Sequence, residues 1–281
     1  MNTNYRFGTF VGRFLVYLLL FFLLLLIVVP IWLLIVNATR STTEIQQGIS
    51  MLPSSHLLEN WRLLRSKGLN LPQGFANSIF LAVSSTVVTV YFSLLTAYAL
   101  VIYEFRGRRL FSNFIVVLVM IPTQFAIVGF YRYMSRLGLA DNYAALILPL
   151  IANAGAVFFG KQYLESMVIQ DLIDAARIDG ASELGIFHKV MMPLAVPGMA
   201  TMGIFAFVAS WNNFFNAFIM ISSIEKYTLP MMVQTLRGDV YRTEYGAIYL
   251  GLAITIVPMI LVYALFSRYI VSGIAMGAVK E

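Results

Sequence analysis

The feature that most constrains this chain is the apolar run from Phe14 to Val36, which contains no charged residue. At about 1.5 Å of helical rise per residue, the run is long enough to cross the roughly 30 Å hydrocarbon core of a bilayer. Arg6 and Arg13 precede it and Ala38 follows it, as in a secretory signal peptide. The run is longer than the core of about 7 to 15 residues usual in such peptides. It therefore predicts an uncleaved first span.

Further apolar stretches recur along the 281 residues, of which 60% are hydrophobic and only 11% are charged. This composition excludes a water-soluble domain and indicates a polytopic membrane protein of the all-α class. We expect a bundle of six transmembrane helices forming a single domain from residue 14 to 281, preceded by a tail of residues 1–13. The predicted spans are 14–36, 75–102, 110–131, 143–160, 194–222 and 245–267.

Six spans would place both termini on the same side of the membrane. The turn at residues 103–109 contains three arginines, which is typical of a cytoplasmic loop, and Arg6 and Arg13 lie before the first span. Counted over the whole chain, Lys and Arg are divided almost equally between the two sides. The predicted cytoplasmic orientation of both termini therefore depends on these five arginines. They also explain the formal charge of +6 without a nucleic-acid partner.

A polar stretch from Asp174 to Pro197 separates two of the predicted spans. Alanine and arginine favour a short helix over residues 174–179, and Gly180 lies where a left-handed residue commonly ends a helix. Asp179 or Ser182 can then cap a second helix. The stretch predicts two helices joined by a tight elbow, although an ordinary loop with two helical turns would fit the same pattern.

The second helix of this elbow places Leu184, Phe187 and Met191 on one face, while Glu183 and Lys189 lie elsewhere on its surface. Alanines in the first helix leave its backbone easy to approach. We therefore expect an apolar knob that fits into a groove of another protein.

Residues 57–65, between the first two spans, form a second amphipathic segment. Leu57, Leu58, Trp61 and Leu64 fall at helical spacing, and charged residues occupy the other faces. This helix either covers its own bundle or forms a docking surface.

Motifs for catalysis and cofactor binding are sparse. The chain has no cysteine, which excludes disulfides and thiolate chemistry. Residues 155–162 resemble a phosphate-binding P-loop, but Gln162 replaces the required Ser or Thr and the run lies in a predicted span, so Lys161 is better explained as a lysine at the membrane boundary. His56 and His188 are predicted on opposite faces of the membrane and cannot share a metal ion. We find no constellation typical of a membrane-embedded enzyme.

The predicted spans contain no paired acidic residues, which argues against a secondary carrier driven by protons or sodium. They do contain uncharged polar groups, which need a polar partner or a wet cavity. Amides together with a tryptophan suit a sugar, which offers hydroxyls and an apolar ring face, but amides that hydrogen-bond neighbouring helices fit equally well. Gln124 is one of these polar groups. The candidate pathway residues are Asn77, Asn153, Trp211, Asn212, Asn213 and Asn216.

The elbow resembles the signature loop, or EAA motif, of import permeases of the ATP-binding-cassette (ABC) class. The residues that match are Ala175, Ala176, Asp179, Gly180, Ala181, Ser182, Phe187, Pro193 and Pro197. Asp174 replaces the leading glutamate, and Gln170 stands where many members have proline. The resemblance implies that residues 170–193 form a cytoplasmic coupling helix docked on an ATPase subunit. The residues it assigns to coupling are Asp174, Ala175, Ala176, Arg177, Asp179, Gly180, Ala181, Ser182, Glu183 and Phe187.

The resemblance extends over most of residues 70–281 and points to carbohydrate-uptake permeases of the maltose type. It rests on Phe75–Ser78, Thr96–Ala99, Phe105–Arg108, Leu137–Leu139, Trp211–Asn212, Thr228–Pro230 and Gly277–Lys280. Gly129 and Glu281 depart from that pattern. The ending is similar to that of the second, smaller permease subunit of a heterodimer.

This resemblance implies a sugar or oligosaccharide importer of the bacterial inner membrane. Its expected partners are a second permease subunit, two ATPase subunits that bind ATP and Mg²⁺, an extracytoplasmic solute-binding protein and membrane lipid. The chain itself would bind no cofactor and catalyse no reaction. A self-sufficient secondary carrier and an ABC permease for a non-sugar solute are the alternatives.

Overall fold

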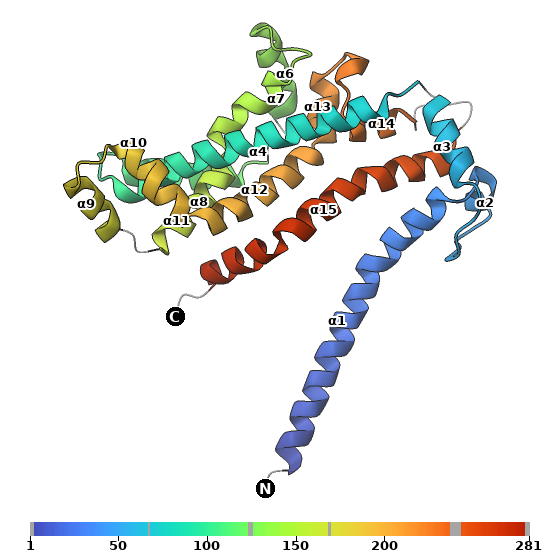
Figure 1. Cartoon of the computed structure of the whole chain (residues 1–281), viewed down its shortest axis with the longest axis horizontal. Helices are drawn as coiled ribbons and strands as arrows, with labels where there is room; N and C mark the ends of the chain where they lie inside the picture. The colour runs from blue at the N-terminus through green and yellow to red at the C-terminus, as the bar shows by residue number, and fades with distance from the viewer. Residues whose placement is uncertain (1–2, 67, 123–125, 168–169, 237–242, 279–281) are drawn as a thin grey trace. The chain divides into compact units, whose positions relative to one another are not determined.

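The computed structural model describes residues 3–66, 68–122, 126–167, 170–236 and 243–278, with side chains described between residues 12 and 266 of these ranges. The described backbone contains helices and no strand, which confirms the all-α prediction (Figure 1). It divides into two compact units. Unit 1 comprises Met1–Leu69 and Val233–Ile256, and unit 2 comprises Asn70–Met232 and Val257–Glu281.

Unit 1 is built on the first apolar helix. Helix α1 (Thr3–Ala38) contains the span Gly12–Ala38, and it is followed by α2 (Thr42–Gln46) and α3 (Leu57–Ser66). Ser41 and Glu44 form a capping box that starts α2. The predicted amphipathic helix at 57–65 is confirmed as α3, in which Leu64 is fully buried whereas Leu57 and Leu58 stay exposed.

The first residues of α15 (Tyr245–Ala278) pack on the turn that follows α1. The buried Asn60 amide donates hydrogen bonds of 2.9 Å to the carbonyl oxygens of Ala38 and Arg40. Gly246 lies directly against Asn60 and the Arg40 carbonyl, so that a Cβ at this position would overlap both. Unit 1 therefore depends on close backbone contact at Gly246.

Unit 2 is organised around the long helix α4 (Leu71–Ile102), which Asn70 caps by accepting a hydrogen bond from the Gln73 amide. Small residues of α4 are buried at helical spacing, namely Ser78, Ala82, Ser85, Thr89, Ser93 and Ala97. Small side chains let neighbouring helices approach closely within a membrane. Helices α8 (Ala154–Glu165) and α12 (Val196–Trp211) pack along this face, and Gly160 of α8 lies against Ala97.

The predicted spans agree with the structure in part. Four described helices are long and apolar enough to cross a membrane: Gly12–Ala38, Leu71–Ile102, Ala144–Glu165 and Tyr245–Phe266. A fifth candidate is the pair Glu183–Leu194 and Val196–Trp211, which is bent by 82°. Helix α15 continues to Ala278, beyond the predicted end of the sixth span at residue 267.

Two predicted spans are not single described helices. The span at 110–131 corresponds to α5 (Arg108–Met120) and α6 (Ile127–Arg136), with residues 123–125, including Gln124, outside the described part. The span at 194–222 is wrong as one helix, because α12 ends at Trp211 and α13 (Phe214–Met220) follows after a break. Both stretches are apolar on average, and mean hydropathy alone cannot locate a break in the helix.

The fourth predicted span is also interrupted, and Pro149 lies at the interruption. It begins as α7 (Ala144–Ile147), tightens into the 3-10 helix η2 (Leu148–Ala152) and restarts as α8 at Ala154. The Asn153 side chain caps α8 by accepting a hydrogen bond of 2.9 Å from the Ala156 amide. Helix α8 ends at Glu165, five residues beyond the predicted boundary at 160.

At the end of unit 2 where α4 begins, Asp141 fixes the loop that contains η4 (Ile224–Lys226) and leads to α14 (Leu229–Thr235). Its carboxylate accepts hydrogen bonds of 2.9 Å from the Ser222 and Ser223 amides and a hydrogen bond of 2.8 Å from Lys226 Nζ. The Lys226 ammonium and the Ser223 donors hold the pKa of Asp141 well below its usual range. The loop is thus tied down at several points.

Candidate functional site

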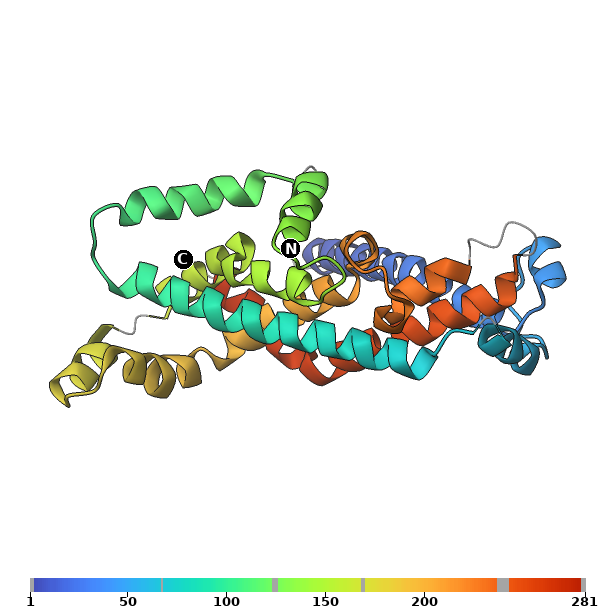
Figure 2. The same cartoon turned by 90° about the horizontal axis from the view of Figure 1, so that it is seen from above.

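The predicted elbow lies at the end of unit 2 where α4 finishes, as Figures 1 and 2 both show. It consists of α9 (Gln170–Ile178), α10 (Glu183–Ile186), the π-helical turn η3 (Phe187–Met191) and α11 (Met192–Leu194). Gly180 has φ +78, and the Ala181 amide donates a hydrogen bond of 3.0 Å to the Ala176 carbonyl, which closes α9 as predicted. Ser182 caps α10, since its Oγ accepts a hydrogen bond of 3.2 Å from the Gly185 amide.

An ionic network holds the two arms of the elbow together. Arg177 Nε donates to Glu183 Oε1 at 2.9 Å, and Arg177 also pairs with Asp174 at 3.2 Å. Tyr103, the residue that ends α4, donates a short hydrogen bond to Glu183, and the Arg177 guanidinium lies 5.8 Å from the centre of the Tyr103 ring. The network therefore joins the elbow to α4.

The charge states in this network are well defined. The Arg177 guanidinium, and secondarily the Tyr103 hydroxyl, hold the pKa of the Glu183 carboxyl below its ordinary value. Burial, together with the hydrogen bond to Glu183, raises the pKa of Tyr103. Glu183 is therefore an anion and Tyr103 a neutral donor around neutral pH. The sequence pattern did not single out Tyr103, because its partner lies 80 residues away.

The inner face of the elbow is part of the core of unit 2. Ile173, Ile186, Phe187 and Met191 are fully buried in a cluster with residues of α4 and α8, and the Phe187 ring contacts that of Tyr98 at a centroid distance of 5.6 Å. The expected shared face of Leu184, Phe187 and Met191 is therefore confirmed for Phe187 and Met191, which lie in one buried cluster, and wrong for Leu184, which is exposed. A π-helical turn connects the two buried residues.

Apolar side chains nevertheless project from the elbow. Ile178 is 87% exposed and Leu184 is 61% exposed, and Leu172 is also exposed. Ala176 and Arg177 are half-buried, and Phe187 cannot touch a partner directly. The other coupling residues assigned by resemblance are exposed: Asp174, Ala175, Asp179, Gly180, Ala181, Ser182 and Glu183. The structure thus brings together a surface of polar and apolar residues. Its most exposed large apolar side chain is that of Ile178, which the sequence did not single out.

Three of the candidate pathway residues have structural partners. The Asn77 amide donates to the carbonyl oxygens of Glu225 and Tyr227 at 2.8 and 3.0 Å, and Asn153 caps α8. Trp211 is 4% exposed, and its ring stacks on that of Phe207 at a centroid distance of 5.8 Å. The prediction that this ring offers a free face to a sugar is therefore wrong. For Asn77 and Asn153, the structure supports the alternative of internal hydrogen bonding.

Asn212 and Asn213 lie at the break between α12 and α13, and Asn216 lies in the first turn of α13. Asn212 is exposed and the other two are half-buried. In the part of the chain that the structure describes, none of their side chains makes a hydrogen bond. Of the predicted pathway residues, these three asparagines are therefore the ones whose side-chain amides remain available to hydrogen-bond a ligand.

The remaining motifs have ordinary surroundings. The P-loop-like run lies inside α8, where the backbone is helical, and Lys161 pairs with Glu165 at 2.8 Å. His56 contacts Glu44, and His188 contacts the Tyr91 hydroxyl. Among the described residues, no group of three or more His, Asp or Glu side chains could hold a metal ion.

Comparisons with known proteins agree with this architecture. Residues 89–276, which include the whole elbow, match the family of the binding-protein-dependent transport system inner membrane component. The chain is 35% identical over 254 residues to the arabinooligosaccharides transport system permease protein AraQ of Halalkalibacterium halodurans, covering 89% of this chain and 90% of that protein. It is 31% identical to the trehalose/maltose transport system permease protein MalG of Thermococcus litoralis, with the same coverage of both chains.

A solved structure extends the agreement to the fold. The chain superposes with a TM-score of 0.80 and 26% identity on a chain of a bacterial ABC transporter involved in the import of the acidic polysaccharide alginate, covering 96% of this chain and 98% of that one. Sequence and fold therefore agree that the chain belongs to the family of binding-protein-dependent transport system inner membrane components.

Proposed function

We propose that this permease is one half of the translocation pathway in an ATP-driven importer of a sugar or oligosaccharide, and that its elbow couples the pathway to an ATPase subunit. The observation that carries the proposal is the way the elbow is exposed on one side and packed on the other. Its outer surface exposes Ile178 and Leu184, while its inner face is fixed to α4 and α8. A rigid element with an exposed apolar tip suits docking into a separate protein.

The substrate class follows from the relatives. AraQ and MalG are named for the transport of arabinooligosaccharides and of trehalose and maltose, and the solved transporter imports a polysaccharide. Carbohydrate transport by the present chain is inferred from that shared class. The free amides of Asn212, Asn213 and Asn216 would offer hydrogen bonds to sugar hydroxyls along the pathway.

The mechanism that we infer is alternating access. ATP binding would draw two ATPase subunits together, and each would move its docked elbow. Because the elbow continues through the 82° bend into α12, its displacement would tilt that helix and change which side of the membrane the pathway opens to. ATP supplies the bias by binding the two states with different affinity.

In the assembly that we propose, this subunit contributes six spans, of which the third comprises α5 and α6, and both of its termini lie in the cytoplasm. Its partners are a second, homologous permease subunit, two ATPase subunits holding ATP and Mg²⁺, and an extracytoplasmic solute-binding protein. The present chain would contribute no nucleotide site of its own.

Reconstitution in liposomes tests the proposal. We expect uptake of arabino- or malto-oligosaccharide only when the two permeases, the ATPase subunits, the binding protein and ATP are all present. Ile178→Asp should reduce uptake roughly tenfold or more, because it places a charge in the docking contact. The matched control is Ile224→Asp, an exposed isoleucine outside the elbow.

Uptake by the permease without ATPase subunits would instead identify a secondary carrier. Normal uptake by the Ile178→Asp variant would reject the docking role of the elbow. ATP-dependent transport of a solute other than a carbohydrate would leave the coupling mechanism in place and correct the substrate class.

A further inference from the structure

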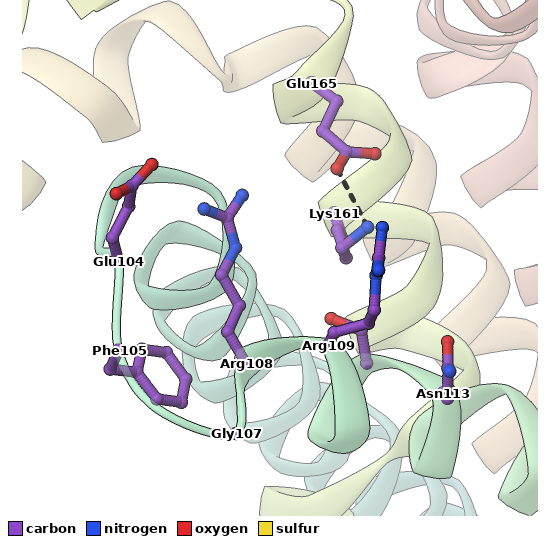
Figure 3. Close-up of a pocket in the computed structure, with 9 residues that line it drawn as sticks. Glu104, Phe105, Gly107, Arg108, Arg109, Asn113, Lys161 and Glu165 are labelled. Carbon is purple, nitrogen blue, oxygen red and sulfur yellow. Dashed lines mark hydrogen bonds and ion pairs between the residues drawn. The ribbon is translucent and has the colours of Figure 1, made fainter.

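A polar cavity of about 740 Å³ lies at the turn between α4 and α5, and the proposed coupling mechanism makes no use of it (Figure 3). Two of its cationic residues, Arg108 and Arg109, are the first residues of α5, and the third, Lys161, comes from α8. The other lining residues are Glu104, Phe105, Gly107, Ser112, Asn113 and Glu165.

The balance of charge in this cavity favours an anion. Lys161 is paired with Glu165 at 2.8 Å, and Arg108 donates one hydrogen bond of 3.3 Å to the Val101 carbonyl. Arg109 makes no ion pair or hydrogen bond with any residue that the structure describes. Three cations thus face two carboxylates, one of which is already engaged. A guanidinium fork with free donors is well suited to a phosphate group.

The backbone at the start of α5 adds donors to the same place. Gly107, with φ +93, precedes the helix, and no side chain caps it. The first amide groups of a helix are therefore left without a capping acceptor, and they carry the positive end of the helix dipole. Ser112 and Asn113, one turn further on, supply neutral polar groups.

The surface next to the cavity is apolar and exposed. Leu110, Phe114 and Val117 of α5 and its C-cap residue Ile121 follow one another at helical spacing, and their exposed fractions lie between 52% and 76%. A basic cavity at the head of an apolar stripe matches an amphiphile with an anionic head and hydrocarbon tails. A free phosphate ion would leave the stripe unused.

We propose that this cavity binds the phosphodiester headgroup of an anionic phospholipid, whose acyl chains lie along the exposed face of α5. Basic pockets between helices at the membrane surface are a known form of lipid recognition. The bound headgroup would also fix the turn 104–107. This turn directly follows Tyr103, which donates to Glu183 of the elbow. The effect on coupling rests on the proposed function, but lipid binding does not.

Lipid binding can be measured on the purified full chain without any ATPase subunit. Native mass spectrometry would compare retention of phosphatidylglycerol with that of phosphatidylcholine carrying the same acyl chains. We expect a preference for phosphatidylglycerol that falls roughly fivefold in each of Arg109→Gln and Lys161→Gln. The control is Arg106→Gln, which removes the same charge from the same turn but does not line the cavity.

A second measurement keeps all charges in place and so does not depend on the folding of the charge variants. Leu110→Trp adds a fluorescent reporter beside the cavity, in a chain with three native tryptophans. Brominated phosphatidylglycerol should quench the added fluorescence more strongly than brominated phosphatidylcholine does.

Three results would overturn the proposal. Equal quenching by the two lipids would show that the headgroup is not recognised. An equal loss of lipid preference in Arg106→Gln would indicate diffuse surface charge and not a site. Displacement of the lipid by excess inorganic phosphate would identify a free phosphate site. Failed ATPase coupling with intact lipid preference would count against the proposed function alone.

Discussion

At the scale of single residues, Gly180 is the position where backbone conformation matters most for the elbow. Its φ of +78 lies in the left-handed region, and no atom lies within 4 Å of the place where a Cβ would be. A side chain at this position would therefore be resisted by the backbone and not by crowding. β-Branched residues tolerate this conformation poorly, whereas asparagine accepts it more readily.

We therefore predict that Gly180→Val impairs coupling while Gly180→Asn largely preserves it. The strain in the valine variant should be roughly 1–2 kcal/mol. The measurement is ATPase activity stimulated by the solute-binding protein in the reconstituted complex, together with the yield of assembled complex. Equal activity in the two variants would show that the left-handed residue is not needed.

Gly246 illustrates a different constraint, which is close approach in unit 1. A Cβ at this position would overlap the Arg40 carbonyl and the Asn60 side chain, and the carbonyl belongs to the backbone and cannot move aside easily. We predict that Gly246→Ala destabilises the chain by about 1 to 3 kcal/mol.

Thermal unfolding in detergent checks this prediction. Gly129→Ala in α6 is the control, because nothing lies within 4 Å of its added Cβ. An unchanged midpoint for Gly246→Ala would mean that the turn after α1 is not packed as described.

The sequence predicted the features of the elbow that depend on neighbouring residues, such as the left-handed Gly180 and the Ser182 cap. It did not predict Tyr103 as a partner of Glu183, or Asp141 as the anchor of the loop at residues 222–226. Those interactions join residues about 80 positions apart, and no local pattern encodes which distant group will be near. Trp211 was predicted as a sugar contact from its residue type, but burial decides its role.

At the scale of elements, the elbow behaves as an extension of α4 because Glu183 links Tyr103 to Arg177. We predict that Tyr103→Phe and Glu183→Gln each weaken coupling, and that the double variant is little worse than the worse single variant. Since the pair is largely exposed, its contribution should be on the order of 1 kcal/mol or less.

A double-mutant cycle on ATP-dependent uptake measures this interaction. Tyr133→Phe, which removes an exposed hydroxyl from α6, is the matched control. Strictly additive losses from the two single variants would show that the two side chains act independently.

The same network makes a prediction about pH. The depressed pKa of Glu183 means that its stabilising contribution is present above its unfolded pKa of about 4.3 and is lost as the pH falls through the folded value. The raised pKa of Tyr103 means that its contribution is present below about 10 and is lost as the pH rises through the folded value.

Coupling, measured as sugar molecules transported per ATP hydrolysed, should therefore stay constant between about pH 5 and pH 9. The Tyr103→Phe and Glu183→Gln variants provide the comparison. A transition near pH 6 to 7 that is absent from both variants would place a titrating group in the network and contradict the assigned charge states.

Hydropathy identified most of the apolar helices but not their breaks. The boundary between α12 and α13 falls at Asn212 and Asn213, and the residues on both sides of these two amides are mostly apolar. Only the two amides indicated a break there. The π-helical turn at Phe187–Met191 was likewise not predicted. Such features depend on packing against other helices and are not contained in a regular 3.6-residue period.

At the scale of the whole molecule, unit 2 carries a fixed structure at each end of α4. Asp141 ties the loop at one end, and the Glu183 network ties the elbow at the other. A helix of 32 residues joins the two ends, with a buried face of small residues along its length. This arrangement suits the transmission of a rigid displacement, which the proposed coupling mechanism requires.

Cysteine cross-linking provides the most direct test of the central claim that the elbow docks on a motor subunit. The chain contains no cysteine, so Ile178→Cys introduces a unique thiol at the most exposed apolar position of the elbow. In inside-out membrane vesicles containing the whole transporter, a short thiol-to-amine cross-linker should join this thiol to the ATPase subunit, and Ile224→Cys should give no such product. A cross-link from residue 224 and none from residue 178, or labelling of residue 178 by an impermeant reagent only from outside the cell, would contradict the account.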